Sequence, residues 1–197
     1  MTRHAPISTS SRPHTSAFCL LPSAFILHNS RVRILGIDPG SISTGFGVID
    51  ADRGRLVLVE LGSINTVRRA ELAERLQQIH EGLLSVIART SPAAVAVETP
   101  FAGPNMKSLI QLAHARGVIL LAARSANLPV FEYSPRSVKS AVVGYGAAEK
   151  QQVAKMVRVL IVGCAQKVMS SDASDALAVA ICHAHTHATT VRLKIAR

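Results

Sequence analysis

Three consecutive runs of strand-forming residues, with no helical segment between them, constrain the fold more than any other feature of this sequence. The first run, ILGID, ends at Asp38 in the turn residues of GIDPG, and the second, STGFGVID, follows directly. The third run, RLVLVELGSI, covers residues 55–64. Short apolar runs separated by turn residues predict strands joined by tight connections. We therefore expect the folded part to begin near Arg33 with three hairpin-like strands.

Helices and strands then alternate along the chain. Residues 69–88 carry apolar side chains at 3.6-residue spacing, which predicts an amphipathic helix. Residues 93–98 are a continuous apolar run that ends in Glu98, as is typical of a strand buried on both faces. The remaining expected elements are a helix at 106–125, a strand at 128–133, a short helix with Pro135 in its first turn, and helices at 148–161 and 172–187. This order predicts an α/β domain whose five-stranded mixed sheet is flanked by helices, and it resembles the ribonuclease H-like fold.

The composition limits the kinds of partner. The chain has 197 residues, of which 22 are Lys or Arg and 12 are Asp or Glu, so its formal net charge is +10. Because 48% of the residues are hydrophobic, the chain can bury a sizeable core and still carry a basic surface. Aromatic residues make up only 4%, which argues against stacking of successive bases on an aromatic platform. Any nucleic-acid binding must rest on charge and shape.

The ends of the chain and its cysteines suggest where folding starts and where the protein works. Residues 1–31 are rich in Ser, Pro and His, contain no acid, and have one apolar patch that Pro22 interrupts. We expect a disordered leader, or a translation start placed too early with Val32 as the true beginning. No apolar run reaches the roughly 20 residues of a membrane span, so no membrane is expected. An odd number of cysteines without CxxC spacing favours a reducing, cytoplasmic location; they are Cys19, Cys164 and Cys182.

Four acidic residues stand where the expected order would bring them together. Asp38 ends the first strand, Glu98 ends the fourth, and Asp172 and Asp175 share one face of the last helix's first turn. Taken singly, strand-end acids are usually solvated and acids at a helix start are usually caps. Two carboxylates about 5 Å apart repel by roughly 3 kcal/mol at an effective dielectric of 20, so a cluster needs protons or a cation. Oxygen ligands suit Mg²⁺ or Mn²⁺, and two such ions can drive hydrolysis of a phosphodiester.

Five sequence blocks, in order, resemble the RuvC family of bacterial Holliday-junction resolvases. They are ILGIDPGSISTGFGVID, AVETPF, LAHARGVILLAA, LPVFEYSPRSVKSAVVGYGAAEKQQV and SDASDALAVAICHAH. The resemblance extends from Arg33 to about His187, so we assign residues 32–190 to a RuvC-like nuclease domain and 191–197 to a basic C-terminal tail.

The resemblance implies an activity, its cofactor and its partners. It implies a Mg²⁺-dependent endonuclease, with two ions per subunit and Mn²⁺ as a substitute. The catalytic and metal-binding carboxylates would be Asp38, Glu98, Asp172 and Asp175. A homodimer would cut four-way junction DNA by paired symmetric nicks, with the RuvA–RuvB branch-migration complex as a further partner.

The resemblance also implies residues that contact DNA. Lys139 and Lys150 flank a glycine-bearing loop and would lie beside the scissile phosphates, where an ammonium can neutralise a phosphate oxygen. Phe101, three residues after Glu98, would stack on bases at the crossover. Two further residues, Arg116 and Arg136, would contact the backbone. Without the resemblance, an exposed lysine is most often merely solvated, and Phe101 is as readily a core residue.

Apart from a catalytically idle DNA-binding or interaction module of the same fold, against which the four intact carboxylates argue, two alternatives remain open from the sequence. One is a RuvC-like nuclease that acts on another structured nucleic acid, because loops rather than carboxylates set the substrate. The other is a phosphate binder of the actin-like ATPase type, since GIDPGSISTG also resembles the phosphate-cradling hairpin of those proteins. Such proteins repeat the fold in two domains and need about twice this length. His183, His185 and His187 share a helix but lack the HExxH pattern, so no histidine metal site is expected.

Overall fold

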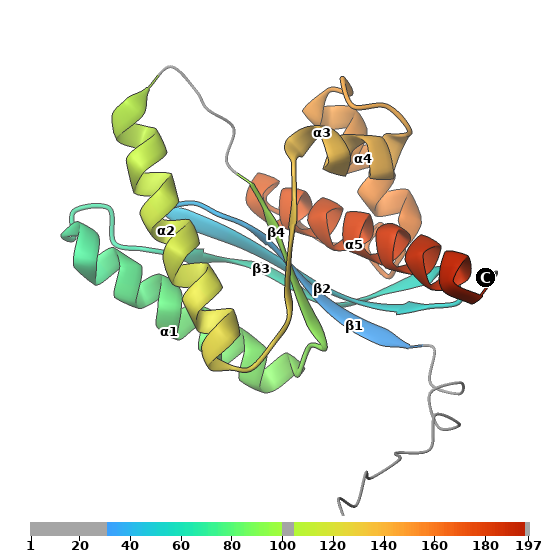
Figure 1. The fold of residues 1–197 in the computed structure, drawn as a ribbon. Helices are drawn as coiled ribbons and strands as arrows, with labels where there is room; N and C mark the ends of the chain where they lie inside the picture. The colour runs from blue at the N-terminus through green and yellow to red at the C-terminus, as the bar shows by residue number, and fades with distance from the viewer. Residues whose placement is uncertain (1–30, 100–104, 196–197) are drawn as a thin grey trace, which may run out of the picture.

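The computed structural model describes residues 31–99 and 105–195. These residues form a six-stranded mixed sheet in the order β5-β4-β1-β2-β3-β6, with helices on both of its faces (Figure 1). The strands are β1 (Val32–Asp38), β2 (Ser43–Asp52), β3 (Arg55–Asn65), β4 (Ala94–Glu98), β5 (Val130–Tyr133) and β6 (Ile161–Val162). The helices are α1 (Leu72–Thr90), α2 (Met106–Ser125), α3 (Pro135–Val143), α4 (Lys150–Leu160) and α5 (Ser171–Ile195).

The pairing of the strands explains why acids meet at one edge of the sheet. β1, β2 and β3 pair in antiparallel fashion, as expected for the three hairpin-like strands. β4 then pairs in parallel with β1, with Ile37 opposite Val97. Adjacent parallel strands end at the same edge of the sheet. Asp38 and Glu98, which come directly after Ile37 and Val97, are therefore neighbours at that edge.

The expected mixed sheet is confirmed, but the expected number of five strands was wrong, since the described residues contain a sixth. Residues 148–161 were expected to form one helix, and Val153, Val157 and Ile161 within this range are four residues apart. Instead α4 ends at Leu160, and Ile161 pairs with Leu56 at the edge of the sheet, where its side chain is buried. An apolar side chain at this position fits the sequence pattern of a helix and also that of an edge strand. Only the tertiary packing therefore decides whether Ile161 belongs to the helix or to the sheet.

Two hydrophobic cores lie on the two faces of the sheet. Neighbouring residues of a strand point to opposite faces, so Ile34 packs in one core and Leu35 in the other. α1 and α2 cover the face that receives Leu35, and α3, α4 and α5 cover the face that receives Ile34 (Figure 1). No helix in the described part of the chain is both long enough and apolar enough to cross a membrane.

α5 lies directly on β1 and β2 because glycines face it. A Cβ atom at Gly36 of β1 would lie 2.1 Å from the carbonyl oxygen of Ala176. A Cβ atom at Gly45 of β2 would lie 2.1 Å from the carbonyl oxygen of Asp172. Any side chain at either position would push the helix off the sheet. This close packing brings the first turn of α5 to the strand edge that carries the acids.

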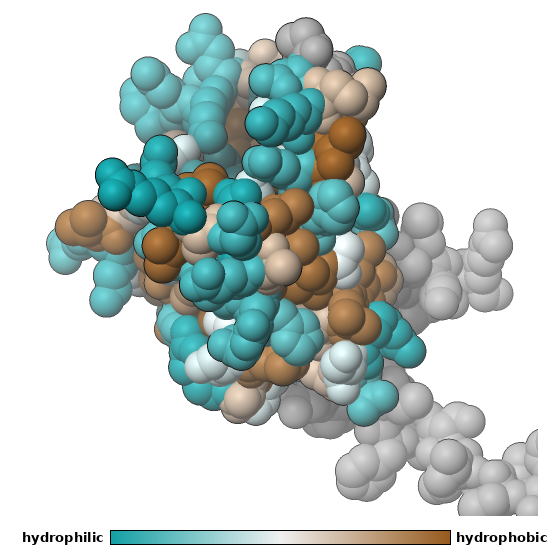
Figure 2. Space-filling view, turned by 90° about the vertical axis from the view of Figure 1, so that its left-hand side faces the viewer, coloured by the Kyte–Doolittle hydropathy of each residue, from teal (hydrophilic) through white to brown (hydrophobic). Residues whose placement is uncertain are grey.

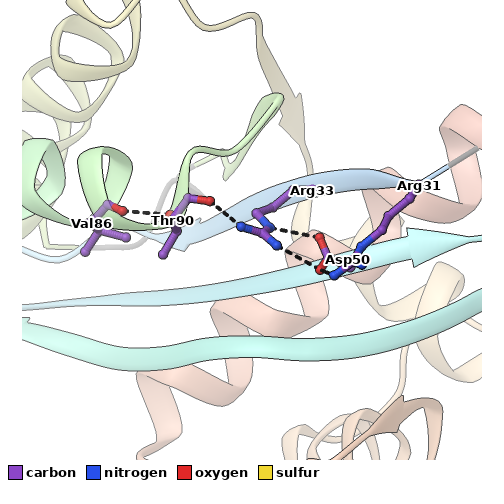
Figure 3. Close-up of polar contacts among 5 residues, drawn as sticks. All are labelled: Arg31, Arg33, Asp50, Val86 and Thr90. Carbon is purple, nitrogen blue, oxygen red and sulfur yellow. Dashed lines mark hydrogen bonds and ion pairs between the residues drawn. The ribbon is translucent and has the colours of Figure 1, made fainter. Parts of the chain in front are cut away.

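A polar network fixes the opposite end of β1 (Figure 3). Arg33 donates to both carboxylate oxygens of the buried Asp50, at 2.9 and 3.1 Å, and to the carbonyl of Thr90 at 2.7 Å. Arg31 pairs with the same carboxylate. Thr90 in turn donates to the carbonyl of Val86. The hydrogen bond from Arg33 outweighs burial and holds the pKa of Asp50 below its usual range, so this acid serves the fold.

Candidate active site

The four predicted acids converge from three elements. Asp38 ends β1, Glu98 ends β4, Asp172 lies in the first turn of α5, and Asp175 follows three residues later in the same helix. Burial, followed by the charges of Asp175, Glu98 and Asp172, raises the pKa of Asp38 to about 7. Burial and the charge of Asp175 likewise raise the pKa of Glu98. The four acids therefore lie near enough for their charges to act on one another.

An open pocket of about 220 Å³ lies beside these acids. Its charged lining comes from the acids Glu98 and Asp175 and from Lys139 of α3 and Lys150 of α4. Apolar residues complete the wall, namely Pro135, Val138, Val153 and Ala178. The acids of this pocket could hold a cation, and its two lysines carry ammonium groups. The pocket can therefore accept an anion that the cation and the two ammonium groups neutralise together.

Lys150 supplies a positive charge inside this cluster. Its Nζ lies 2.5 Å from Oδ2 of Asp175. Burial alone would lower the pKa of Lys150, but the hydrogen bond to Asp175 raises it above its usual value. Burial also raises the pKa of Asp175, and the contact with Lys150 only partly offsets that effect. The ammonium therefore compensates part of the acidic charge and leaves the rest uncompensated.

The carboxylate oxygens of the site suit a hard divalent cation, although the acids are not grouped closely enough to form a ready metal site. Among the described residues, no three His, Cys, Asp or Glu side chains are grouped closely enough to form a ready metal site. The available donors are carboxylate oxygens, which Mg²⁺ prefers. The ammonium of Lys150 already contacts Asp175. Burial and the negative charges of Asp175, Glu98 and Asp172 raise the pKa of Asp38, and bound cations would offset those charges. Asp38, Glu98, Asp172 and Asp175 are thus the residues that could hold such ions.

Comparison with known proteins assigns the family. The family model described as "Crossover junction endodeoxyribonuclease RuvC" matches residues 34–183. The chain belongs to the RuvC family. The crossover junction endodeoxyribonuclease RuvC of Syntrophotalea carbinolica is 53% identical over 154 residues, which cover 78% of this chain and 94% of that protein. The protein of the same name from Chloroflexus aggregans is 46% identical over 164 residues, covering 83% and 99%.

Solved structures confirm the expected ribonuclease H-like fold. Thermus thermophilus RuvC in complex with a Holliday junction substrate matches with a TM-score of 0.75 and 34% identity, covering 81% of this chain and 96% of that chain. The yeast mitochondrial Holliday junction resolvase Ydc2 matches with a TM-score of 0.59 at 13% identity, which shows the fold alone. Membership of the RuvC family favours the nuclease hypothesis over the actin-like ATPase alternative.

The other predicted DNA-contacting residues of this RuvC-family chain are more dispersed. Arg136 lies on α3 and lines a separate shallow groove, and its side chain packs against Gly146. Arg116 of α2 is paired with Glu132 of β5. Phe101 falls in residues 100–104, outside the described part of the chain. Of the four predicted contacts in the described part of the chain, Lys139 and Lys150 are the two that line the pocket.

One contact at the site was not predicted from the sequence. Ser43, the first residue of β2, donates a hydrogen bond from its Oγ to Oδ2 of Asp172 at 2.5 Å. Ser43 is one of two serines in the turn GSISTG, and serine is common in turns for its own backbone contacts. Its approach to a residue 129 positions later depends on α5 lying on the glycine-bearing face of β2.

His183 of α5 has a role in the core. It is buried, its ring stacks on Phe131, and its Nδ1 shares a 2.7 Å hydrogen bond with the hydroxyl of Tyr133. Burial lowers the pKa of His183 to about 4, so it is neutral at physiological pH. These contacts link α5 to β5, the edge strand next to β4.

Proposed function

We propose that this chain is an endodeoxyribonuclease that resolves four-way (Holliday) DNA junctions during recombination and repair. The proposal rests on one observation above all. In a chain of the RuvC family, the acids at the ends of two adjacent parallel strands meet the first turn of α5 beside a pocket lined by two lysines. The substrate is inferred from relatives named crossover junction endodeoxyribonucleases and from the structure of T. thermophilus RuvC with a Holliday junction.

The four acids are proposed as the ligands of two Mg²⁺ ions per subunit, for which Mn²⁺ would substitute. When bound, such ions activate water and stabilise the leaving oxygen of an in-line phosphodiester displacement. The protein's part is to hold Asp38 and Glu98 at adjacent strand ends and to hold Asp172 and Asp175 against them through α5. Because these positions are fixed by the sheet and by close helix packing, little reorganisation is needed when the charged substrate arrives.

Lys139 and Lys150 are proposed to bind the phosphate that is cut. Both line the same pocket as Glu98 and Asp175, so the two ammonium groups, together with cations held by the acids, would neutralise a phosphate that enters it. Their charges already lower the pKa of Glu98, although burial dominates the shift. This arrangement favours phosphate binding over solvation of the two ammonium groups.

The remaining proposed contacts lie farther along the DNA. Arg136 would bind the DNA backbone from its groove beside α3. Arg116 would have to exchange the carboxylate of Glu132 for a phosphate, because the two are already paired. Phe101 would stack on bases at the crossover.

A homodimer is proposed because a four-way junction is two-fold symmetric and needs two cuts. α2 offers a surface for it, with three large apolar residues exposed along one side, namely Met106 (67%), Ile110 (50%) and Leu121 (59%). Ala113 and Gly117 lie between them, and a Cβ atom at Gly117 would meet nothing within 4 Å. Figure 2 views the side of the molecule that carries α1 and α2, where hydrophobic residues reach the surface among hydrophilic ones.

We also infer a cellular setting from the family. Junction resolution in the RuvC family suggests a working partnership with the RuvA–RuvB branch-migration complex. A cytoplasmic location agrees with a DNA substrate and with the free, buried thiols of Cys164 and Cys182.

The test is cleavage of defined DNA substrates by the purified full-length protein. A synthetic four-way junction and a linear duplex of matched sequence are incubated with Mg²⁺ or with EDTA. Paired nicks in the junction alone, only with Mg²⁺, are expected. Equal cutting of both substrates, or cutting that survives chelation, would contradict the proposal. Preferential cutting of three-way or flapped DNA would favour the alternative of another structured substrate.

A further inference from the structure

We propose that Ser43 is a positioning residue that orients the carboxylate of Asp172 for metal binding. Oγ of Ser43 donates to Oδ2 of Asp172 at 2.5 Å, across 129 positions of sequence. A hydrogen bond to a carboxylate is charge-assisted and roughly twice as strong as one between neutral groups. The contact therefore selects one orientation of the Asp172 side chain. This inference rests on the proposed role of Asp172 as a metal ligand.

Asp172 needs such a contact because of its place in the helix. It lies in the first turn of α5, where backbone N–H groups lack partners within the helix and attract carboxylates. Left free, its side chain could turn back onto these groups. Ser170 instead accepts the N–H of Ala173 at 3.2 Å and so provides the cap. With the cap supplied by Ser170, Ser43 can hold Asp172 from the side of the sheet.

The donor itself is held in place by the turn that precedes β2. Oγ1 of Thr44 donates to the carbonyl of Gly40 at 2.7 Å, and the N–H of Thr66 donates to the carbonyl of Ile42 at 2.9 Å. Gly45, two residues after Ser43, lets the backbone of Asp172 lie against β2. β2 thus fixes both the backbone of Asp172, through close packing, and its side chain, through the hydroxyl.

The chemistry of a hydroxyl suits this task. A carboxylate has about four lone-pair sites, so accepting one hydrogen bond leaves Oδ1 and part of Oδ2 available to a cation. A hydroxyl carries no charge and does not compete with the cation as an ammonium would. Losing the Ser43 hydroxyl should therefore weaken metal binding and leave the chemical step at saturating metal nearly unchanged.

The first measurement is Mn²⁺ affinity, from the electron paramagnetic resonance signal of free Mn²⁺, with the DNA-free full-length protein. Ser43→Ala is expected to weaken Mn²⁺ binding roughly tenfold, within the range for a lost hydrogen bond to a charged group. Ser43→Thr keeps the hydroxyl and should bind as the wild type does. Ser43→Val has nearly the shape of threonine without the hydroxyl and should match Ser43→Ala, which separates the hydroxyl from any effect on folding.

A matched control lies on the next strand. Ser63 of β3 shares a 2.9 Å hydroxyl contact with Ser170 at the start of the same helix, and this contact involves no carboxylate. Ser63→Ala should therefore leave Mn²⁺ affinity unchanged. In junction cleavage, Ser43→Ala should raise the half-saturating Mg²⁺ concentration by a similar factor and change the maximal rate less than about twofold.

Asp172→Asn separates the two ways in which the inference could fail. If Asp172→Asn weakens Mn²⁺ binding while Ser43→Ala and Ser43→Val bind like the wild type, the role of Ser43 is overturned and the proposed function stands. If Asp172→Asn itself binds Mn²⁺ normally, Asp172 is not a metal ligand, and the inference fails together with that part of the proposed function. A fall in maximal rate with unchanged metal dependence would also overturn the positioning role.

Discussion

Nζ of Lys150 lies 2.5 Å from Oδ2 of Asp175, so an ammonium group contacts one of the four acids of the candidate active site. Lys150 begins α4, whose capping box is formed by Glu149 and Gln152. The backbone at this lysine is therefore fixed, whereas its side chain is 63% exposed and can change partner. A bound cation would compete with Lys150 for the carboxylate of Asp175, and a phosphate in the pocket would compete with Asp175 for the ammonium of Lys150.

Replacing Lys150 by methionine tests this competition. We expect Lys150→Met to bind Mn²⁺ more tightly than the wild type without DNA, because the competing ammonium is gone. Junction cleavage should fall roughly 100-fold, the cost typical of losing one group that stabilises charge in a transition state. Lys139→Met is the matched control, since Lys139 lines the same pocket without forming an ion pair with Asp175. Equal gains in Mn²⁺ affinity for both variants would show that the direct contact has no special role.

Asp38 should make the metal-free protein less stable as the pH rises. Its pKa is about 7 in the folded state against an ordinary 3.8, so the unfolded chain loses this proton first. Between pH 4 and 7 the folded state binds more protons, and its free energy of unfolding falls by about 4 kcal/mol across that range. Asp38→Asn removes this effect. In EDTA, its melting temperature should exceed that of the wild type at pH 8 and be close to it at pH 4, while cleavage is lost.

A wild-type protein whose stability in EDTA does not fall between pH 4 and pH 8 would contradict the raised pKa of Asp38.

Asp50 should show the opposite pH dependence. Its pKa is lowered in the folded state, so the stability it contributes is present above the ordinary value of 3.8 and is lost as the pH falls through the folded value. Arg33→Met leaves this buried carboxylate with Arg31 as its only ion-pair partner in the described residues. We expect a loss of about 3 kcal/mol in urea unfolding at pH 7, and a smaller difference at pH 3, because without the hydrogen bond from Arg33 the buried carboxyl can take up a proton there instead of staying charged. A difference that is the same at both pH values would contradict this account.

The elements that could be predicted from the sequence are those whose signal is local. Residues 106–125 form a helix with the predicted bounds, and Asp38 and Glu98 end strands as expected, because turn residues and apolar runs mark those ends. The contacts of Ser43 and Lys150 with the acids could not be predicted, since they depend on how α5 and α4 pack on the sheet. β6 was not predicted either, because its pairing with β3 also depends on tertiary packing.

The first residues of the chain are predicted to be dispensable for cleavage. The family match begins at residue 34, and the described structure begins at Arg31. Deleting residues 1–30 should leave junction cleavage and the melting temperature unchanged. Deleting residues 1–31 also removes Arg31, whose side chain is largely exposed and whose partner Asp50 keeps Arg33, so the loss should stay below about 1 kcal/mol. A large drop in cleavage for either deletion would identify the leader as a functional arm.

Gly45 controls the distance between β2 and the acids of α5. Gly45→Ala would place a Cβ atom 2.1 Å from the carbonyl oxygen of Asp172, so the start of α5 must move outward. We expect a destabilisation of about 1–3 kcal/mol from overpacking. Cleavage at saturating Mg²⁺ should fall roughly 100-fold, because a displacement of about 1 Å at reacting groups has that cost.

Gly54 provides the control for Gly45, because the two glycines matter for different reasons. Gly54 lies between β2 and β3 with a φ of +86°, and a Cβ atom there would meet nothing within 4 Å. Gly54→Ala should therefore strain only the backbone, lower stability by about 1 kcal/mol, and leave cleavage by the folded protein unchanged. If Gly45→Ala also cleaved junctions within about twofold of the wild-type rate, contact between β2 and α5 would not set the geometry of the acids.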